Sequence, residues 1–482
     1  MKKSILKKQL DGLNNQNHSR FHMPGHKGRG EDFNIFNYDI TEIPGADNLH
    51  DAQGIIAQVQ QKLAAIYGSD EAAMLVNGTT TGIHSAILGA CCPGDKLIIP
   101  TNCHRSVFGA LALGRIEGVF ITPEFDKLMG FAREITLASV KEAIIRYPDS
   151  IGMVLTNPTY YGTTSDVKAI AGFLHRQRKF LIVDEAHGAH LHFNDALPLD
   201  AMAAGADISI QSTHKILGSL TQSSLIHFQG SRINRQRVKS FLALLQSSSP
   251  SYPLMISVEE AVDSAYEKGS GVFKMIIDAH QNFCDKQGSN VPITLYADDA
   301  SSTGYDRSKW LFHTQGIAGD QVEELLSKTH GIQCEMSGNN HVLAMTGMGT
   351  TAADINALIL GIADLNKKIM SDGFSGKATV QDKHRTETVL FKDSIKTEMP
   401  LWQALYSNEK ESIPLAEAVN RLAGDFIIPY PPGIPVLLPG SRISQKIIDG
   451  LNQLIDNSVA VVGIHENREL LLLKEEGARN EA

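Results

Sequence analysis

Short runs of apolar residues alternate with amphipathic stretches through the first half of the chain. At residues 53–67 apolar side chains recur at helical spacing, and Gly68 follows as a helix terminator. Similar helical patterns cover 80–90 and 167–178. The runs that predict strands lie at 74–76, 96–100, 119–122, 153–156, 180–184 and 207–211. Continuous apolar strands separated by helices predict a mostly parallel sheet covered by helices on both faces.

The pattern weakens beyond about residue 260. Strand-like runs recur at 310–314 and 341–344, with a helical pattern at 319–327. Residues 367–397 are polar without clear periodicity, which indicates a linker. We therefore expect an N-terminal segment at 1–55, a large domain at 56–290, a small domain at 291–366, the linker at 367–397 and a C-terminal domain at 398–482.

Composition narrows the class of protein. A chain of 482 residues, 42% of them apolar, is long enough for two or three domains with a substantial core. The net charge of −9 argues against nucleic acid as a partner. The start lacks the apolar run of a secretion signal, and no apolar stretch is long enough to predict a membrane span. Five cysteines without metal-ligand spacing favour a reducing, cytoplasmic compartment.

Polar motifs follow the strand runs, and the carboxyl ends of parallel strands are where ligands gather in such sheets. Ser212-Thr213-His214-Lys215 comes directly after the run at 207–211. A lysine there suits Schiff-base formation with an aldehyde, which requires a neutral amine that burial and nearby cations favour. The hydroxyls suit a phosphate. The alternative is an ordinary surface lysine after a strand.

A second motif, DEAHGAH at 184–190, closes the run at 180–184. An aspartate at a buried strand end needs a cationic partner, and a protonated pyridine nitrogen is one that would make the ring an electron sink. Alternatively, Asp184 caps the next helix. A metal site from Asp184, His187 and His190 is a further alternative, but the spacing is not that of a helical zinc motif and we expect no metal.

Three more strand-end motifs offer polar groups to the same edge. The turn with Gly78, Thr79 and Thr80 precedes a helix and suits a phosphate, although such turns also cap helices without a ligand. His104 could stack on a flat cofactor or be structural. The segment 156–162 ends in NPTYYG, which is equally typical of a proline turn.

Together these motifs resemble the fold-type I enzymes that use pyridoxal 5′-phosphate (PLP), and most closely the ornithine/lysine/arginine decarboxylase family. The resemblance covers almost the whole chain in family order. It rests on FHMPGHKG (21–28), DITE (39–42), DNLH (47–50), NGTT (77–80), the turn at 102–106, NPTYYG (157–162), DEAHGAH (184–190), STHK (212–215), LTQSS (220–224), SSPSY (248–252) and PYPPGIP (429–435).

The resemblance implies an α/β, PLP-dependent transferase-like large domain with a mostly parallel seven-stranded sheet, a small α/β domain and a C-terminal domain. It implies that Lys215 forms the internal aldimine, that Asp184 pairs with the pyridine nitrogen, and that His104 is the third catalytic residue. The remaining cofactor-binding residues would be Ala186 and His104 on the two ring faces, His187, and, around the phosphate, Gly78, Thr79, Thr80, Ser212 and His214.

The implied reaction is decarboxylation of arginine, lysine or ornithine to agmatine, cadaverine or putrescine. Ser249 would reach the cofactor of the neighbouring subunit in a homodimer. Glu42 and Asp47 are acidic candidates for the cationic end of the substrate, although each suits a cap equally well. The chain looks like the short form of the family, without the N-terminal wing domain. Ser441 stands where family members usually have a glutamate, which puts the C-terminal contribution to substrate binding in doubt.

Two alternatives stay open at this stage. One is another fold-type I enzyme, such as an aminotransferase or a lyase, which would give a keto acid instead of CO₂ and an amine. The other is a non-catalytic relative that binds PLP.

Overall fold

The computed structural model describes residues 19–474, apart from 23–24, 28, 30–34, 36–37, 44–45, 289, 298–303, 372–396, 431–432, 457–458 and 466. Most of the expected linker at 367–397 lies outside these residues, as do parts of the motifs FHMPGHKG and PYPPGIP. Within the described residues, no helix is long and apolar enough to cross a membrane.

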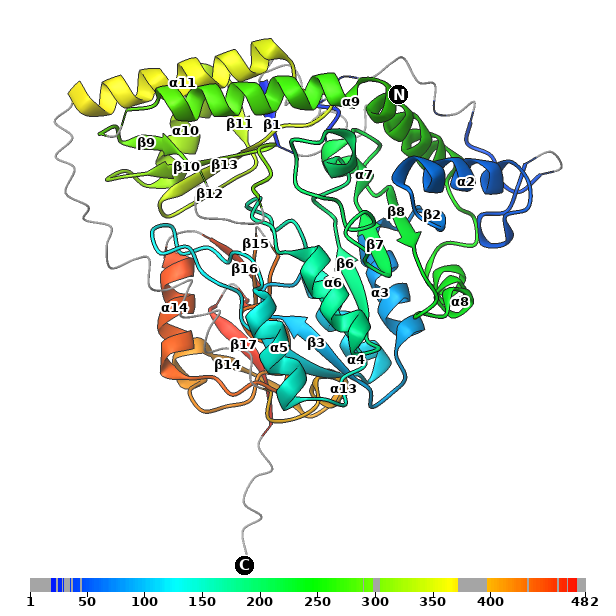
Figure 1. The fold of residues 1–482 in the computed structure, drawn as a ribbon. Coiled ribbons are helices and arrows are strands. Elements are labelled where there is room, and N and C mark those ends of the chain that lie inside the picture. Colours follow the sequence, from blue (N-terminus) through cyan, green and yellow to red (C-terminus); the bar gives the residue numbers. More distant parts are fainter. Residues whose placement is uncertain are drawn as a thin grey trace, which may run out of the picture.

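The large domain is built on a seven-stranded sheet (Figure 1). All of its strands run in one direction except β8, which pairs antiparallel with β2 and β7. The mostly parallel seven-stranded sheet expected from the sequence is therefore confirmed. In spatial order the strands are β2 (Glu71–Leu75), β8 (Ser224–Phe228), β7 (Ile208–Gln211), β6 (Phe180–Asp184), β5 (Gly152–Thr156), β3 (Lys96–Pro100) and β4 (Glu117–Ile121).

Helices cover both faces of this sheet because the strands are apolar on both sides. In β6, Ile182 packs on one face, whereas Leu181 and Val183 pack on the other. Burying each such side chain stabilises the fold by about 1.5–3 kcal/mol. The first face is covered by α3 (Gly78–Ala90), α4 (Arg105–Gly114) and α8 (Arg235–Leu245), and the second by α5 (Leu137–Arg146) and α6 (Val167–Arg176).

Local capping interactions fix where these helices begin and end. Asp166 caps α6 by accepting from the N–H of Ala169 (2.9 Å). The helix α2 (Ile55–Tyr67) ends at Gly68, whose φ of 65° closes the C-terminus in the left-handed region, as its sequence predicts.

The small domain is an antiparallel four-stranded sheet with helices against it. The helix α9 (Tyr252–Lys286) continues from the large domain and lies beside α11 (Ala352–Ser371) over this sheet (Figure 1). Because α11 runs to Ser371, helix extends past the boundary expected at 366. The other elements are α10 (Gly319–His330), β9 (Ile293–Leu295), β10 (Lys309–Thr314), β11 (Ile332–Cys334), β12 (Met336–Gly338), β13 (His341–Met345) and β1 (Ser19–Phe21), which pairs parallel with β11.

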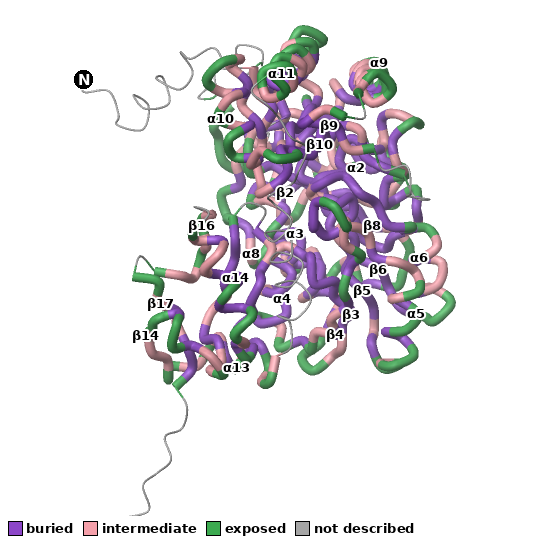
Figure 2. Tube along the Cα trace, turned by 90° about the vertical axis from the view of Figure 1, so that its left-hand side faces the viewer, coloured by how far each residue is buried: buried purple, intermediate pink, exposed green. Residues whose placement is uncertain are grey.

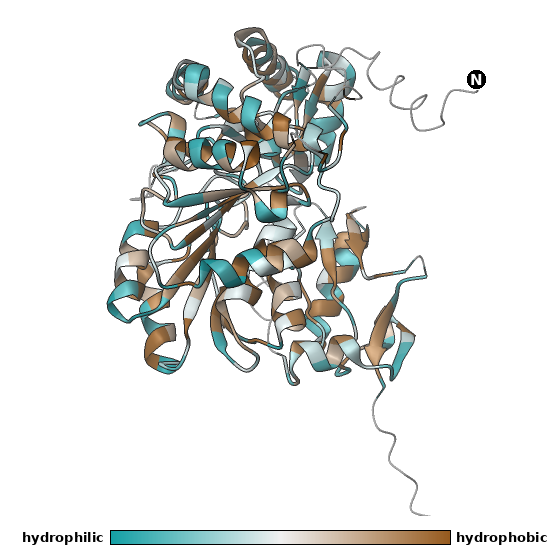
Figure 3. Ribbon diagram, turned by 90° about the vertical axis from the view of Figure 1, so that its right-hand side faces the viewer, coloured by the Kyte–Doolittle hydropathy of each residue, from teal (hydrophilic) through white to brown (hydrophobic). Residues whose placement is uncertain are grey.

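The C-terminal domain packs its own apolar cluster. Its strands form two antiparallel pairs, β14 with β17 and β15 with β16. Its elements are α13 (Leu401–Tyr406), β14 (Lys410–Pro414), η4 (Leu415–Glu417), β15 (Ile428–Tyr430), α14 (Gln445–Asp456), β16 (Ala460–Val462) and β17 (Glu469–Leu473). Buried residues fill the interiors of the domains, and the central strands carry the most apolar side chains (Figures 2 and 3).

Candidate active site at the carboxyl ends of the central strands

The turn after β7 carries Lys215 on the short helix α7 (Thr213–Ile216). Its side chain is partly exposed, and its Nζ lies 2.8 Å from Nε2 of His187. Burial of the amine lowers the pKa of Lys215, while the carboxylates of Asp184 and Glu335 oppose that shift. This environment favours the neutral amine that nucleophilic attack requires.

Asp184 ends β6 beside Lys215 and is buried. Its Oδ1 accepts a hydrogen bond from the backbone N–H of Ala186 (3.2 Å). Burial raises the pKa of Asp184, and the positive charge of Lys215 opposes the shift. A buried carboxylate in this position is suited to an additional cationic partner.

The other polar residues of DEAHGAH point to different parts of the structure. Glu185 is fully buried and accepts from Ser209 Oγ (2.7 Å) and Gln211 Nε2 (2.8 Å), so it belongs to the sheet and not to the site. His190 Nε2 lies 3.0 Å from Asp306, whereas His187 faces Lys215. In the described part of the chain, no group of three or more His, Cys, Asp or Glu side chains is arranged to hold a metal ion.

A cradle for an anion lies between α3 and α7. Gly78 begins α3 with a φ of 76°, and the preceding Asn77 makes no side-chain cap to the helix. The buried Thr79 Oγ1 lies 2.6 Å from Ser212 Oγ, which joins the two turns, while Thr80 is exposed. His214 donates from Nδ1 to the carbonyl of Ser223 (2.8 Å). Uncapped N–H groups and hydroxyls at a helix start are the donors that phosphate prefers.

His104 begins α4 as its N-cap. Its Nδ1 lies 2.8 Å from Ser106 Oγ, which fixes the orientation of the ring. Burial, followed by the nearby charge of Lys215, lowers the pKa of His104 to about 4, so its ring is neutral. The carbonyl of Gly433 accepts from the N–H of Arg105 (3.4 Å), which places Gly433 of PYPPGIP against this turn.

Three further side chains lie at the site: Lys309 and Glu335, which no motif contained, and Tyr160, which belongs to NPTYYG but had no role of its own. Lys309 begins β10 in the small domain, is fully buried, and lies 3.4 Å from Nδ1 of His187. The Tyr160 ring lies against the same imidazole at an angle of 59°, with ring centroids 4.6 Å apart, and its hydroxyl donates to Glu335 (2.5 Å). A lysine directly before the apolar residues 310–312 was the signal available in the sequence for Lys309.

The N-terminal motif FHMPGHKG also meets this site. The N–H of Gly25 donates to the carbonyl of His214 (2.8 Å), and a Cβ on Gly25 would lie 2.4 Å from the carbonyl oxygen of Ile216. Lys27 donates to the carbonyls of His22 (2.6 Å) and Met345 (2.9 Å). The motif therefore braces the helix that carries Lys215.

The other sequence candidates lie elsewhere. Asp47 accepts from the N–H groups of Gly54 (2.8 Å) and Ile56 (2.9 Å) and so caps α2, the alternative that the sequence left open. Glu42 is exposed. Ser249 is exposed in the loop before α9, and Ser441 is fully buried in the C-terminal domain.

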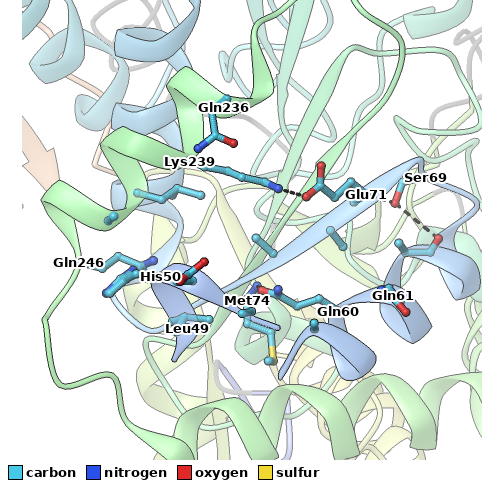
Figure 4. Close-up of a pocket in the computed structure, with 18 of the residues that line it drawn as sticks. Leu49, His50, Gln60, Gln61, Ser69, Glu71, Met74, Gln236, Lys239 and Gln246 are labelled. Carbon is cyan, nitrogen blue, oxygen red and sulfur yellow. Dashed lines mark hydrogen bonds and ion pairs between the residues drawn. The ribbon is translucent and has the colours of Figure 1, made fainter. Parts of the chain in front are cut away.

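A separate pocket of about 660 Å³ lies beside the edge strand β2 (Figure 4). It is lined by residues of α2, β2 and α8, among them Gln60, Glu71 and Lys239. None of the strand-end residues described above lines it.

Comparison with known proteins gives the family. The model of the Orn/Lys/Arg decarboxylase major domain matches residues 6–295, and that of the C-terminal domain of the same family matches 384–466. The chain is 33% identical to an arginine decarboxylase of Bacillus subtilis over 459 residues, with 92% of each chain covered. It is also 33% identical to an arginine decarboxylase of Bacillus anthracis over 465 residues, covering 93% of this chain and 92% of the relative.

The fold is shared with solved structures. Lysine decarboxylase A from Pseudomonas aeruginosa superposes with a TM-score of 0.79 at 19% identity, covering 98% of this chain and 76% of the other. The fold-type I architecture expected from the motifs is thus confirmed. With both domain models matched in order and relatives that align over nearly the whole chain, the protein belongs to the Orn/Lys/Arg decarboxylase family.

Proposed function

We propose that the protein decarboxylates a basic L-amino acid with PLP as cofactor, and that arginine is its preferred substrate, giving agmatine and CO₂. The observation that carries the proposal is the convergence of the Lys215 amine and the Asp184 carboxylate at the strand ends. Arginine is favoured over lysine and ornithine because the relatives at 33% identity are named arginine decarboxylases.

The donor set fits PLP. An aldehyde needs an amine with a lowered pKa, which Lys215 has. A phosphate needs N–H and hydroxyl donors, which Gly78, Thr79, Thr80, Ser212 and His214 would supply around the cradle between α3 and α7. A pyridinium needs a buried carboxylate, and Asp184 is one.

When bound, PLP supplies an electron sink for the pair of electrons left when the Cα–carboxylate bond breaks. Asp184 would hold a proton on the pyridine nitrogen. His104 and Ala186 would orient the ring from its two faces, with the His104 ring kept in place by Ser106. Lys215 would bind the cofactor aldehyde, and the substrate amine would later displace it, which leaves Lys215 as a free amine.

The proposal includes a homodimer in the cytoplasm. Ser249 is exposed in the loop before α9, where it is available to a second copy, in line with the role that the family resemblance implies. The five cysteines are free, as suits a reducing compartment. The mass of the particle in solution, measured by light scattering, tests the dimer; a monomer at micromolar concentration would refute it.

Substrate tests separate the proposal from its alternatives. We expect CO₂ release from arginine, and kcat/KM for arginine higher by roughly tenfold to a hundredfold than for citrulline. One buried, charge-assisted contact is worth about 1.5–3 kcal/mol, which corresponds to that ratio. Lysine, ornithine and norleucine complete the series. A keto acid as product would identify an aminotransferase, and a neutral or acidic amino acid as best substrate would refute recognition of a basic side chain.

A further inference from the structure

An acidic side chain of the small domain lies at the site beside Tyr160. Glu335 stands between β11 and β12, and its backbone N–H donates to the carbonyl of Leu343 in β13 (2.9 Å). Its Oε1 accepts a hydrogen bond from the hydroxyl of Tyr160 (2.5 Å), which belongs to the large domain. The carboxylate is therefore held from both domains, while its side chain stays partly exposed.

A short series of contacts connects this carboxylate to Lys215. The Tyr160 ring lies against the imidazole of His187, with ring centroids 4.6 Å apart, and Nε2 of that imidazole lies 2.8 Å from Nζ of Lys215. One phenol ring and one imidazole ring thus separate Glu335 from the amine, and Lys215 is close enough to feel the charge of Glu335. A ligand held at the amine needs a long side chain, such as that of arginine, to reach the carboxylate.

The hydroxyl of Tyr160 orients the glutamate. Burial, followed by the charge of Glu335, raises the pKa of Tyr160, so the phenol stays protonated and donates. An ionised carboxylate has about four lone-pair sites on its two oxygens, and so it can accept a guanidinium in addition to a phenol.

The other acidic candidates have different surroundings. Asp184 lies where it would face the pyridine nitrogen, and Glu185 accepts from two side chains and one backbone N–H of the large domain. Asp306 accepts from an imidazole and a backbone N–H. Ser441 carries no carboxylate at all. Of these four residues and Glu335, only Glu335 combines a carboxylate at the site with partial exposure.

Two further lysines lie close enough to Glu335 to feel its charge. Lys27 directs its Nζ to two backbone carbonyls, and Nζ of Lys309 lies at Nδ1 of His187. The acceptors for a cationic ligand are therefore concentrated at Glu335.

We propose that Glu335 is the specificity-determining residue that binds the guanidinium end of the substrate, and that Tyr160 is a positioning residue that holds the glutamate through its hydroxyl. This inference rests on the proposed function and deepens it, because it names the side chain that selects a basic amino acid. It also gives the small domain a direct part in substrate recognition.

The first test removes the negative charge. Glu335→Gln keeps nearly the same side-chain volume but cannot form a charge-assisted bond with a guanidinium. We expect kcat/KM for arginine to fall roughly tenfold to a hundredfold, while kcat/KM for the neutral isostere citrulline changes by less than about threefold. An equal loss for the two substrates would contradict the proposal, because it is what a structural role gives.

The second test uses length complementarity. Glu335→Asp withdraws the carboxylate by one methylene, and homoarginine is longer than arginine by one methylene. We expect the ratio of kcat/KM for homoarginine to that for arginine to rise about tenfold over the wild-type ratio. An unchanged ratio would show that the carboxylate does not contact the guanidinium.

The third test separates orientation from contact. Tyr160→Phe keeps the ring against His187 but removes the hydroxyl that holds Glu335. We expect KM for arginine to rise about threefold to tenfold with kcat within about twofold of wild type, as loss of one hydrogen bond predicts. A lower kcat with unchanged KM would contradict the positioning role of Tyr160.

Glu324→Gln is the matched control, because it removes a negative charge from an exposed position of the same domain, where the carboxylate pairs with Lys328. Its kcat/KM values should stay within about twofold of wild type. Calorimetry with agmatine, which keeps the guanidinium, gives a readout without turnover. Binding should weaken about tenfold or more in Glu335→Gln and stay unchanged in Glu324→Gln. Equal agmatine affinities in these two variants would overturn the proposal whatever the reaction, and CO₂ release by the wild-type enzyme tests the proposed function separately.

Discussion

At the scale of single residues, three lysines feel the charge of Glu335, and two of them, Lys215 and Lys309, also lie at the His187 imidazole. Their neighbours distinguish them. Lys27 donates to backbone carbonyls, and Lys309 has the charge of Asp306 close to it. Lys215 meets His187 and Asp184 and stays partly exposed, as a group that binds a cofactor must. These surroundings, rather than position in the fold alone, support the proposal that Lys215 is the nucleophile.

The first prediction concerns Asp184. Asp184→Asn should lower kcat by roughly 10² to 10³ while weakening PLP binding much less, because a neutral amide cannot keep the pyridine nitrogen protonated when negative charge develops. Losing an interaction with a buried charge costs roughly 3–5 kcal/mol. Steady-state kinetics and a PLP titration measure the two quantities. A variant whose kcat stays within about threefold of wild type would rule out this role.

Residue-level reasoning from sequence predicted which strand-end residues lie together, and it missed the side chains that the small domain contributes. Lys215, Asp184, His104 and Thr79 follow strands of one sheet, whose carboxyl ends share an edge. The parallel order therefore places them together. Lys309 and Glu335 come from the small domain, and nothing in their local sequence shows that its strands reach His187.

At the scale of elements, the short helix α7 depends on segments far away in sequence. The N–H of Gly25 donates to the carbonyl of His214, and the N–H of Met348 donates to that of Ile216 (2.9 Å). These bonds tie the N-terminal motif and the small domain to the helix that carries Lys215. The conformation of that helix is therefore set by tertiary contacts.

Substitution of Gly25 tests this bracing. A Cβ in Gly25→Ala would lie 2.4 Å from the carbonyl oxygen of Ile216, so the backbone around Lys215 must shift. Overpacking of this kind costs about 1–3 kcal/mol, and we expect kcat/KM to fall about tenfold or more.

The matched control is Gly271→Ala in α9, where an added Cβ meets no atom within 4 Å. Removing a helical glycine there should raise the free energy of unfolding by about 0.5–1 kcal/mol and leave activity unchanged. Equal kcat/KM values for the two variants would show that Gly25 does not brace α7.

Element prediction from the sequence was most accurate for buried parallel strands. The expected strands at 96–100 and 180–184 coincide with β3 and β6, because their continuous apolar runs are unambiguous. The strand β8 was missed, since it begins with Ser224 and contains the buried His227, which obscure the apolar pattern. The long helix α9 was missed as well. It runs from the large domain into the small domain, where the hydrophobic pattern was too weak to predict a helix.

At the scale of the whole molecule, the interior holds several neutral histidines. Burial lowers the pKa of His227 and of His280 to about 3, and the pKa of His214 to about 4. In the unfolded chain these groups protonate near pH 6.5. Between that value and the folded pKa the unfolded state binds more protons, so the free energy of unfolding falls as the pH falls.

His280 offers a test of this linkage. Its Nε2 is buried without a hydrogen-bond partner among the described residues, and its ring lies against Trp310. His280→Leu should flatten the pH dependence by up to about 1.4 kcal/mol per pH unit between pH 6 and 5. Urea unfolding of both proteins at these pH values measures it. An unchanged slope would mean that His280 is not neutral in the folded protein.

The whole-molecule account depends on which lysine holds the cofactor, since Lys215, Lys309 and Lys27 all lie near Glu335. Reduction of the PLP-loaded protein with borohydride, followed by peptide mapping, identifies the lysine that becomes pyridoxylated. The account predicts that the label is on Lys215 and that Lys215→Ala carries none and releases no CO₂ from arginine. A label on Lys309, Lys27 or any other lysine would contradict it.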